Sequence, residues 1–226
     1  MPFGSGQPVI CVVTDRRRLP PPVDDSLIRL VTAVAAAGVD LIQVRERDLD
    51  ARGLLTLTCH VRDAAAGRAA VIVNDRTDVA LAAGVRGVHL RGDSAETVRV
   101  RAIVPRGFLV GRSVHSAAEA TVRGAGTDFL IAGTVFHTAS KPGLNRPLGP
   151  DGLEAVCRAV DRPVLAIGGM TADNIGDIGA TGAAGIAAIG IFTDLVTAVC
   201  DEHLDARMER LVSALRKRFR RSVPRQ

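Results

Sequence analysis

The chain has 226 residues, of which 47% are hydrophobic and 23% charged, a composition typical of a soluble globular protein with a large buried core. It contains six Phe and no Trp or Tyr, so it lacks the aromatic platforms on which single-stranded nucleic acids stack. The formal net charge of +5 comes largely from a basic tail at about 216–226, which is more typical of a solvated helix end than of a nucleic-acid-binding arm.

Neither a membrane span nor a secretory signal is predicted. No segment approaches the roughly 18 consecutive apolar residues of a span, and the amino terminus has no basic stretch followed by an apolar run. The cysteines form no C-x-x-C pair, so we expect them to be small core residues rather than zinc ligands or disulfides. They are Cys11, Cys59, Cys157 and Cys200. We therefore expect a cytoplasmic protein.

Short apolar runs rich in β-branched residues alternate with Ala-rich helical stretches along the whole chain. The runs are Val9–Thr14, Leu41–Val44, Ala70–Val73, Gly87–Leu90, Phe108–Val110, Phe129–Ala132, Val164–Ile167 and Gly185–Ile189. The clearest helices are Ser26–Ala37, Ala51–Ala66, Ser116–Gly124, Gly152–Val160, Thr171–Ala180 and a closing helix, Leu204–Phe219. Continuously apolar runs indicate parallel strands buried on both faces. Because no G-x-G-x-x-G follows the first run, we expect an α/β fold in which residues 1–226 form a single (β/α)8 TIM barrel.

Glycines follow the last two strands, where barrels commonly bind phosphate. Gly168 and Gly169 end the seventh strand, and Gly190 ends the eighth, so backbone N–H groups could approach an anion closely. The alternative is that these glycines only make tight turns. We favour the phosphate site because both halves fall where the architecture predicts them.

A polar cluster follows the second strand. The two-residue period of an extended chain places Gln43, Arg45 and Arg47 on one side, with three donor groups directed at the barrel mouth. Arginine binds phosphate through paired hydrogen bonds, so the cluster favours a phosphate-bearing ligand over simple surface charge. After the third strand, Asn74 could bind the ligand and Asp75 could bind Mg²⁺, although both are also common helix caps.

The segment 133–150 is long for a compact connection and rich in Gly, Pro, Ser and Thr, which is typical of a functional loop. Its Thr138, Ser140 and Lys141 suggest a phosphate or diphosphate clamp. His137 in this loop, and His115 after the fifth strand, are candidate acids or bases, but lone loop histidines are more often solvated or capping.

Taken together, these motifs resemble the thiamine phosphate synthase family and its relative, the thiazole tautomerase (TenI) branch, over residues of about 9–195. The resemblance is carried by Gln43-Val44-Arg45-Glu46-Arg47, Val73-Asn74-Asp75-Arg76, Gly87-Val88-His89-Leu90, Gly111-Arg112-Ser113-Val114-His115-Ser116, the 133–143 loop and Ala166-Ile167-Gly168-Gly169-Met170.

The resemblance implies that the chain joins hydroxymethylpyrimidine diphosphate to thiazole phosphate, with Mg²⁺, and releases diphosphate. It makes Arg45, Ser113 and Lys141 the candidate catalytic residues and Asp75 a metal ligand. Contacts to the pyrimidine diphosphate would come from Gln43, Asn74, Arg45 and Lys141, and contacts to the thiazole phosphate from Thr138, Ser140, Gly168, Gly169 and Gly190. Arg47 stands where the family usually has lysine, which keeps the positive charge.

One departure concerns the metal. After the fourth strand the family usually has an Asp that binds Mg²⁺, and here Ser94 takes that position unless Asp93 shifts in as the second ligand. Arg91 is expected to replace part of the metal's charge. The 111–116 segment and Ile189–Phe192 look closer to the tautomerase branch, but that branch's loop histidine is Thr134 here.

Three functions therefore stay open. The leading hypothesis is a thiamine phosphate synthase acting on phosphorylated pyrimidine and thiazole substrates. The alternatives are a thiazole phosphate tautomerase and a non-catalytic binder that kept the thiazole phosphate site. A homo-oligomer is compatible with the sequence, which does not decide the oligomeric state.

Overall fold

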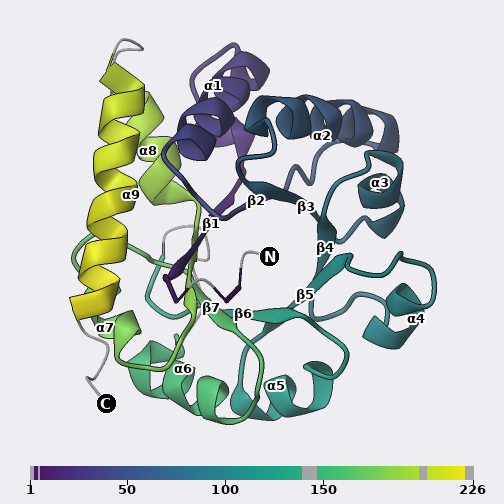
Figure 1. The fold of residues 1–226 in the computed structure, drawn as a ribbon, viewed down its shortest axis with the longest axis vertical. Helices are drawn as coiled ribbons and strands as arrows, with labels where there is room; N and C mark the ends of the chain where they lie inside the picture. Colours follow the sequence, from purple (N-terminus) through teal and green to yellow (C-terminus); the bar gives the residue numbers. More distant parts are fainter. Residues whose placement is uncertain (1–2, 5, 139–146, 199–202, 222–226) are drawn as a thin grey trace.

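The structure, a computed structural model, describes residues 3–4, 6–138, 147–198 and 203–221. Eight parallel strands form a closed barrel in chain order, and the first strand pairs with the last (Figure 1). The strands are β1 (Val9–Val13), β2 (Leu41–Val44), β3 (Ala70–Asn74), β4 (Gly87–Leu90), β5 (Leu109–Val114), β6 (Phe129–Gly133), β7 (Val164–Ile167) and β8 (Gly185–Ala188). The predicted TIM barrel is confirmed.

Helices cover the outside of the barrel (Figure 1). Within the described residues they are α1 (Val23–Ala36), α2 (Ala51–Ala65), α3 (Thr77–Ala82), α4 (Thr97–Arg101), α5 (Ala117–Arg123), α6 (Gly149–Arg158), α7 (Ile175–Gly179), α8 (Gly190–Ala198) and α9 (Leu204–Arg221), with a short 3-10 helix, η1 (Arg16–Arg18), after β1. Asp50 and Ser116 cap α2 and α5 by accepting hydrogen bonds from backbone N–H groups of the first turn.

Alternate strand residues point into the barrel and form a small core of their own. Phe129 is fully buried there, and its ring occupies the space beside Gly111, where any Cβ would collide with it. Phe3 packs on Phe129, with ring centroids 5.2 Å apart, and so covers the amino end of the barrel. The intervening strand residues face the helices and form the larger core. The interior is therefore filled at the amino end, and polar groups gather at the other.

All eight predicted strands are present, but β5 differs in extent. The prediction ended at Val110, whereas the strand continues to Val114, because Ser113 and Val114 pair with Ile131 and Ala132 of β6. A stretch with Gly, Arg and Ser has the composition of a loop, and only its neighbour strand makes it extended. The candidate hydroxyl of Ser113 consequently lies on a rigid strand.

The boundaries of α1, α6 and α7 differ from the predicted ones, and α6 runs from Gly149 to Arg158 rather than from Gly152 to Val160. Helix α1 begins at Val23 rather than Ser26, directly after Pro22, because proline is suited to a helix start. Helix α7 is shorter than predicted, because the Thr171 and Asn174 side chains bond to the backbone in a turn before it. The short helices α3, α4 and α8 were not among the clearest predicted ones.

The basic tail is indeed the end of a helix as far as the described residues extend, but two of its arginines are anchored. Arg216 donates to Gln7, to the Gly38 carbonyl and to Asp40, at 3.0 Å for the carboxylate. Arg218 pairs with Asp173 at 2.9 Å. The predicted solvated face is therefore partly an attachment of α9 to the barrel.

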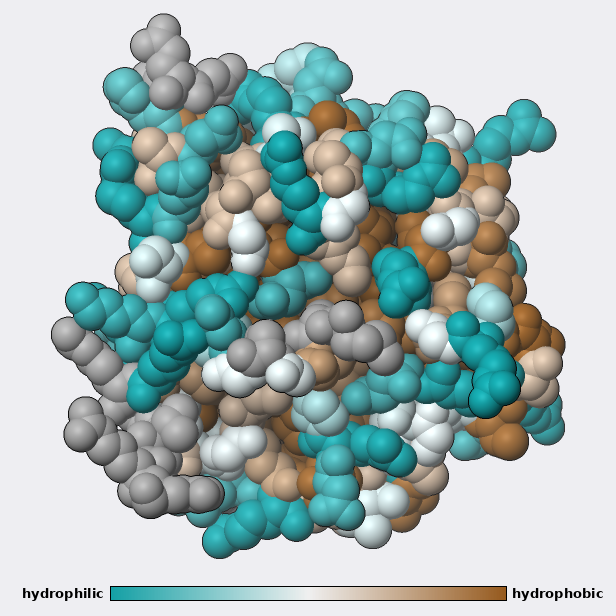
Figure 2. Space-filling view, in the orientation of Figure 1, coloured by the Kyte–Doolittle hydropathy of each residue, from teal (hydrophilic) through white to brown (hydrophobic). Residues whose placement is uncertain are grey.

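The composition also predicted the absence of a membrane span and buried, unpaired cysteines. Among the described residues no helix is long and apolar enough to cross a membrane. Cys11 is a buried core residue as predicted, Cys59 and Cys157 are half-buried against the core, and Cys200 lies outside the described residues. Figure 2 shows hydrophilic side chains over much of one face, with hydrophobic residues at the surface near α4, where Val98 is 73% exposed.

Candidate active site

Polar side chains fill the carboxyl end of the barrel interior on the β2 to β5 side. The Gln43 amide donates to Asn74 Oδ1 at 3.1 Å, across the β2–β3 pair. Gln43 is 3% exposed, and its Oε1 has no hydrogen-bond partner within the described part of the chain. A buried, unpartnered acceptor is rare in folded proteins and suits a ligand donor. The structure thus brings together two of the predicted pyrimidine-side residues.

His89 and Ser113 form a second interior pair. His89 Nε2 lies 2.8 Å from Ser113 Oγ, between the neighbouring strands β4 and β5. Burial, followed by the nearby charge of Arg112, lowers the pKa of His89 to about 3. The imidazole is therefore neutral at physiological pH and orients the Ser113 hydroxyl without adding charge. The sequence did not predict a role for His89, whose side chain lies on the inner face because it alternates with the outward-facing Val88 and Leu90.

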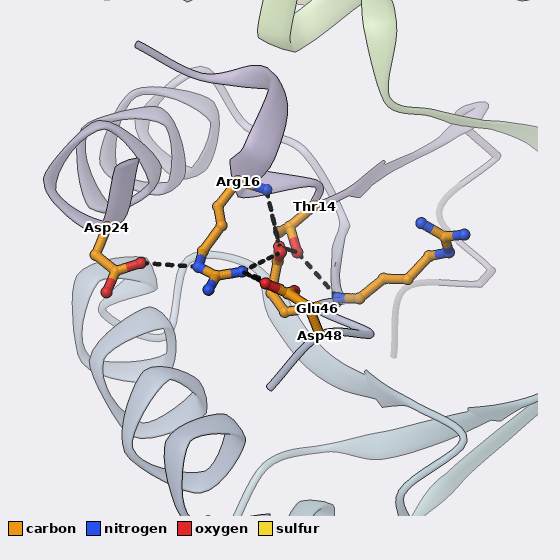
Figure 3. A network of polar contacts seen from close by, with 6 residues as sticks. Thr14, Arg16, Asp24, Glu46 and Asp48 are labelled. Atoms are coloured by element: carbon orange, nitrogen blue, oxygen red, sulfur yellow. Dashed lines mark hydrogen bonds and ion pairs between the residues drawn. The ribbon is translucent and has the colours of Figure 1, made fainter. Parts of the chain in front are cut away.

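Arg45 follows β2 and is held through its backbone. Its N–H donates to Thr14 Oγ1 at 2.9 Å, and the Thr14 hydroxyl donates to Glu46 at 2.6 Å. Glu46, with 1% of its side chain exposed, also accepts from the Arg16 backbone N–H at 3.1 Å (Figure 3). The Arg16 guanidinium continues the network to Asp24 and Asp48, so several bonds define the position of this turn.

The Arg45 guanidinium is half-buried in positive surroundings. Burial, then the like charge of Arg47, and further Arg91, lower the pKa of Arg45, while Asp15 and Glu46 oppose them. Arg47 itself is exposed, because β2 ends at Val44 and the two-residue alternation does not keep its side chain in the interior. A half-buried guanidinium beside other cations is prepared for an anion that carries several charges.

The predicted metal residues lie on neighbouring strand ends. Asp75 follows β3 in a left-handed conformation, φ 65°, and its Oδ1 accepts a hydrogen bond from the Ser94 hydroxyl. Arg91 Nη1 lies 3.7 Å from Asp75 Oδ2, and Arg91 Nη2 pairs with Asp93. Asp93 is 71% exposed. The structure therefore places Asp75 and Asp93 on either side of one guanidinium.

A buried arginine supports the segment that carries these groups. Arg112 is 1% exposed on the outer face of β5, and its guanidinium donates to the Ala95 carbonyl. The Ser94 hydroxyl accepts from the Arg91 N–H at 2.7 Å, which closes the turn 91–94. The sequence did not indicate this positioning role of Arg112, because the contact with Ala95 joins two segments that only the folded barrel brings together.

The predicted phosphate glycines lie at the ends of the adjacent strands β7 and β8. Gly168 and Gly169 have φ values of 102° and 65°, and a Cβ on Gly169 would lie 2.5 Å from the His137 carbonyl oxygen. Gly190 is the first residue of α8, and the first N–H groups of a helix have no carbonyl partner in a preceding turn and can bind an anion. The Arg18 guanidinium, paired with Asp194 at 3.2 Å, lies near Gly190, with Nη2 3.4 Å from the position of a Cβ there.

The long loop is only partly described. Thr134 is buried and Thr138 is half-buried, whereas Ser140 and Lys141 lie outside the described residues. His137 is exposed, and His115 is exposed with its Nδ1 on the Gly133 carbonyl of β6. The candidate histidines therefore stand at the rim, and the buried imidazole is His89.

Comparisons with known proteins show which family the chain belongs to. Residues 10–192 match the TMP-TENI family, described as thiamine monophosphate synthase. A thiamine-phosphate synthase of Methanoculleus marisnigri is 43% identical over 163 residues, which cover 71% of this chain and 77% of that protein. A thiamine-phosphate synthase of Roseiflexus castenholzii is 37% identical over 191 residues, covering 84% and 82%.

Solved structures give the same result at lower identity. A thiamine phosphate pyrophosphorylase from Pyrococcus furiosus is 29% identical and superposes with a TM-score of 0.77. The superposition covers 96% of this chain and 97% of that protein. A 3-hexulose-6-phosphate synthase, at 22% identity and a TM-score of 0.67, shares the fold alone. The match over residues 10–192, with relatives of about this length, means that the chain belongs to the thiamine monophosphate synthase family.

Proposed function

We propose that the chain is a thiamine-phosphate synthase, which joins hydroxymethylpyrimidine diphosphate to thiazole phosphate and releases diphosphate. The observation that carries the proposal is that two separate sets of groups suited to phosphate lie at one end of the barrel. One set is Arg45 and Asn74, with Asp75 as the proposed metal ligand, and the other is the backbone at the glycines after β7 and β8. A reaction that couples a diphosphate to a phosphate monoester needs both.

In the proposed reaction the C–O bond between the pyrimidine methylene and the diphosphate breaks, and its electron pair leaves with the diphosphate. The thiazole nitrogen then donates its lone pair to form the new C–N bond. Catalysis consists mainly of holding the two partners and stabilising the leaving charge. No proton has to be removed, which is compatible with a His89 that stays neutral.

On the diphosphate side, Arg45 binds the leaving group, and its half-buried position strengthens the interaction. Gln43 and Asn74 orient the pyrimidine from the barrel interior. Ser113, directed by His89, provides a hydroxyl where the two substrates meet. Arg47 and Lys141 are proposed to supply further positive charge to the diphosphate.

The oxygen groups at Asp75 fit Mg²⁺ in kind, since the ion prefers carboxylate and other oxygen donors and is often bound by one or two carboxylates together with substrate phosphates. Asp75 is the proposed protein ligand, with the Ser94 hydroxyl next to it. Asp93 remains the second proposed ligand, and its carboxylate faces Arg91. When bound, Mg²⁺ would neutralise negative charge on the diphosphate.

On the phosphate side, the N–H groups after β7 and at the start of α8 bind the thiazole phosphate, supported by Thr138 and Ser140. Asn174 donates to the Gly169 carbonyl at 2.8 Å, which leaves the Gly169 peptide held in one orientation. The amino end of α8 also favours negative charge through the helix dipole.

The enzyme is proposed to be a single-domain, cytoplasmic protein. Residues 1–226 would form one domain, since Arg216 of α9 bonds to Gln7 and Asp40 near the start of the barrel. The described cysteines are free thiols, in keeping with a reducing, cytoplasmic location. A homo-oligomer remains compatible with the fold.

The test is thiamine phosphate formation by the purified chain from both substrates, with Mg²⁺ and with a chelator. Metal-dependent product supports the synthase. Isomerisation of the thiazole phosphate without coupling would instead identify a tautomerase, and binding without turnover would identify a binder. Asp75→Asn should lower the rate in Mg²⁺ to the rate measured with the chelator. If Asp93 is also a ligand, Asp93→Asn should lower the rate in the same way.

A further inference from the structure

Arg91 occupies a place that the predicted metal chemistry does not explain. It follows β4, and its guanidinium lies 3.7 Å from Asp75 and is paired with Asp93. The two carboxylates proposed for the metal therefore both pair with the same side chain. Across the described residues there is no group of three or more His, Cys, Asp or Glu able to hold a metal ion.

The guanidinium is available to a ligand. Arg91 is 45% exposed and Asp93 is 71% exposed, and an exposed ion pair of this kind contributes little to stability. Exchanging Asp93 for a diphosphate as the partner of Arg91 therefore costs little free energy. The diphosphate also offers the guanidinium two oxygen atoms in the planar arrangement that arginine binds best.

Arg91 also lies next to the other cations of the site. Strands β2, β3 and β4 are consecutive neighbours, so the residues that follow them, Arg45, Asp75 and Arg91, share one edge of the barrel. The turn that carries Arg91 is held by Ser94 and, through the Ala95 carbonyl, by the buried Arg112. Arg91 is thus attached to a supported turn rather than to a free loop.

We infer that Arg91 binds the leaving diphosphate directly and so supplies part of the charge neutralisation that a metal ion would otherwise give. The inference rests on the proposed synthase function, which makes diphosphate the ligand. It assigns Asp93 the role of a partner that holds Arg91 while the diphosphate is absent. It also predicts that this chain binds diphosphate to a measurable degree without metal.

The experiment is calorimetric titration of the full chain with inorganic pyrophosphate, in EDTA and then in saturating Mg²⁺. In EDTA we expect the wild type to bind and Arg91→Gln to bind about 10-fold or more weakly, the effect of losing a charged hydrogen-bonding group. Arg91→Lys should recover part of the loss. In Mg²⁺ the difference between wild type and Arg91→Gln should shrink, because the metal neutralises the same charge.

Arg99→Gln is the matched control, since Arg99 is exposed on α4 in the same part of the chain and carries the same charge. It should bind pyrophosphate within about twofold of the wild type, as expected for an exposed charge outside the site. A second variant, Ser94→Asp, places a carboxylate beside Asp75. It should weaken pyrophosphate binding in EDTA and strengthen binding of Mn²⁺, measured by electron paramagnetic resonance as a metal readout independent of activity.

Equal pyrophosphate affinity of wild type and Arg91→Gln in EDTA would overturn the inference, as would wild-type binding that occurs only with Mg²⁺. These outcomes leave the proposed function standing if thiamine phosphate is formed. Conversely, Arg91-dependent pyrophosphate binding by a chain that forms no thiamine phosphate supports Arg91 as a diphosphate-binding residue and overturns the synthase that would release this diphosphate. Circular dichroism checks that each variant is folded.

Discussion

The two sides of the barrel mouth offer a ligand different kinds of groups. On the β2 to β5 side the groups are side chains, among them Arg45, Ser113 and the proposed metal ligand Asp75, and Glu46 and Arg112 support the segments that carry them. On the β7 and β8 side they are backbone N–H groups, exposed by Gly168, Gly169 and Gly190. We call these the side-chain half and the backbone half of the mouth. A substitution in the side-chain half replaces a group offered to the ligand, whereas the backbone half requires that its three glycines carry no side chain.

The difference follows from the ligands proposed for each side. A diphosphate carries more charge than a phosphate monoester and leaves with an additional electron pair, so it needs cations that oppose this charge. A phosphate monoester that only has to be held is bound adequately by N–H groups at a helix start. Both departures from the synthase pattern, Arg47 after β2 and Ser94 after β4, lie on the β2 to β5 side of the mouth.

The largest expected effect is at Arg45. Arg45→Ala should lower kcat/KM for the pyrimidine diphosphate by about 100- to 1,000-fold, because it removes a preorganised charge from the departing group. Steady-state kinetics with each substrate varied in turn measures this. Arg52→Ala, an exposed arginine on α2, is the control and should stay near wild type. An equal loss for Arg52→Ala would show that net charge, rather than the site, is responsible.

The backbone half is tested by Gly169→Ala. The new Cβ would lie 2.5 Å from the His137 carbonyl oxygen at a φ of 65°, so the turn must move. We expect KM for the thiazole phosphate to rise by about 30-fold, the equivalent of ~2 kcal/mol. Gly38→Ala is the matched control, because its φ of 84° is equally unfavourable but no heavy atom lies within 4 Å. An unchanged KM for Gly169→Ala would place the phosphate elsewhere.

His89, in the side-chain half, should make the free energy of unfolding depend on pH. Its pKa is about 3 in the folded chain and near 6.5 when unfolded, so the unfolded state binds the extra proton first. The free energy of unfolding should fall as pH decreases from 6.5 toward 3, by up to about 1.4 kcal/mol per pH unit, and this contribution is fully present above pH 6.5. Urea unfolding of wild type and His89→Gln at several pH values isolates it. Parallel curves would refute a neutral buried imidazole.

The smallest expected effect concerns Arg18, a side chain on the backbone half. Arg18→Ala should raise KM for the thiazole phosphate by about three- to tenfold, since the guanidinium lies beside Gly190, where we propose that the phosphate binds, and its partial exposure keeps the effect small. Asp194→Asn should lower the same KM slightly by releasing Arg18. If both substitutions raise KM, the pair serves to hold η1 against α8 and does not contact the phosphate.

Features carried by a single strand or turn could be predicted from the sequence. The buried strands follow from continuous apolar runs and are confirmed, and Gly168, Gly169 and Gly190 lie after the last two strands as predicted, while their binding of phosphate stays a prediction. The prediction was less complete where groups on different strands meet. The His89–Ser113 pair, and the support of the Ala95 carbonyl by Arg112, join residues 24 and 17 positions apart.

By itself the sequence determined the barrel, the edge at which the polar groups collect, and the residue types available there, because strand periodicity and the order of elements are local properties. Only the tertiary structure decided which groups face one another: that Asp75 meets Ser94 and Arg91, that Asp93 turns to the same arginine, and that Arg47 leaves the interior. Barrel closure sets those neighbours through the register of eight strands, and register is a relation between distant segments that no single segment encodes.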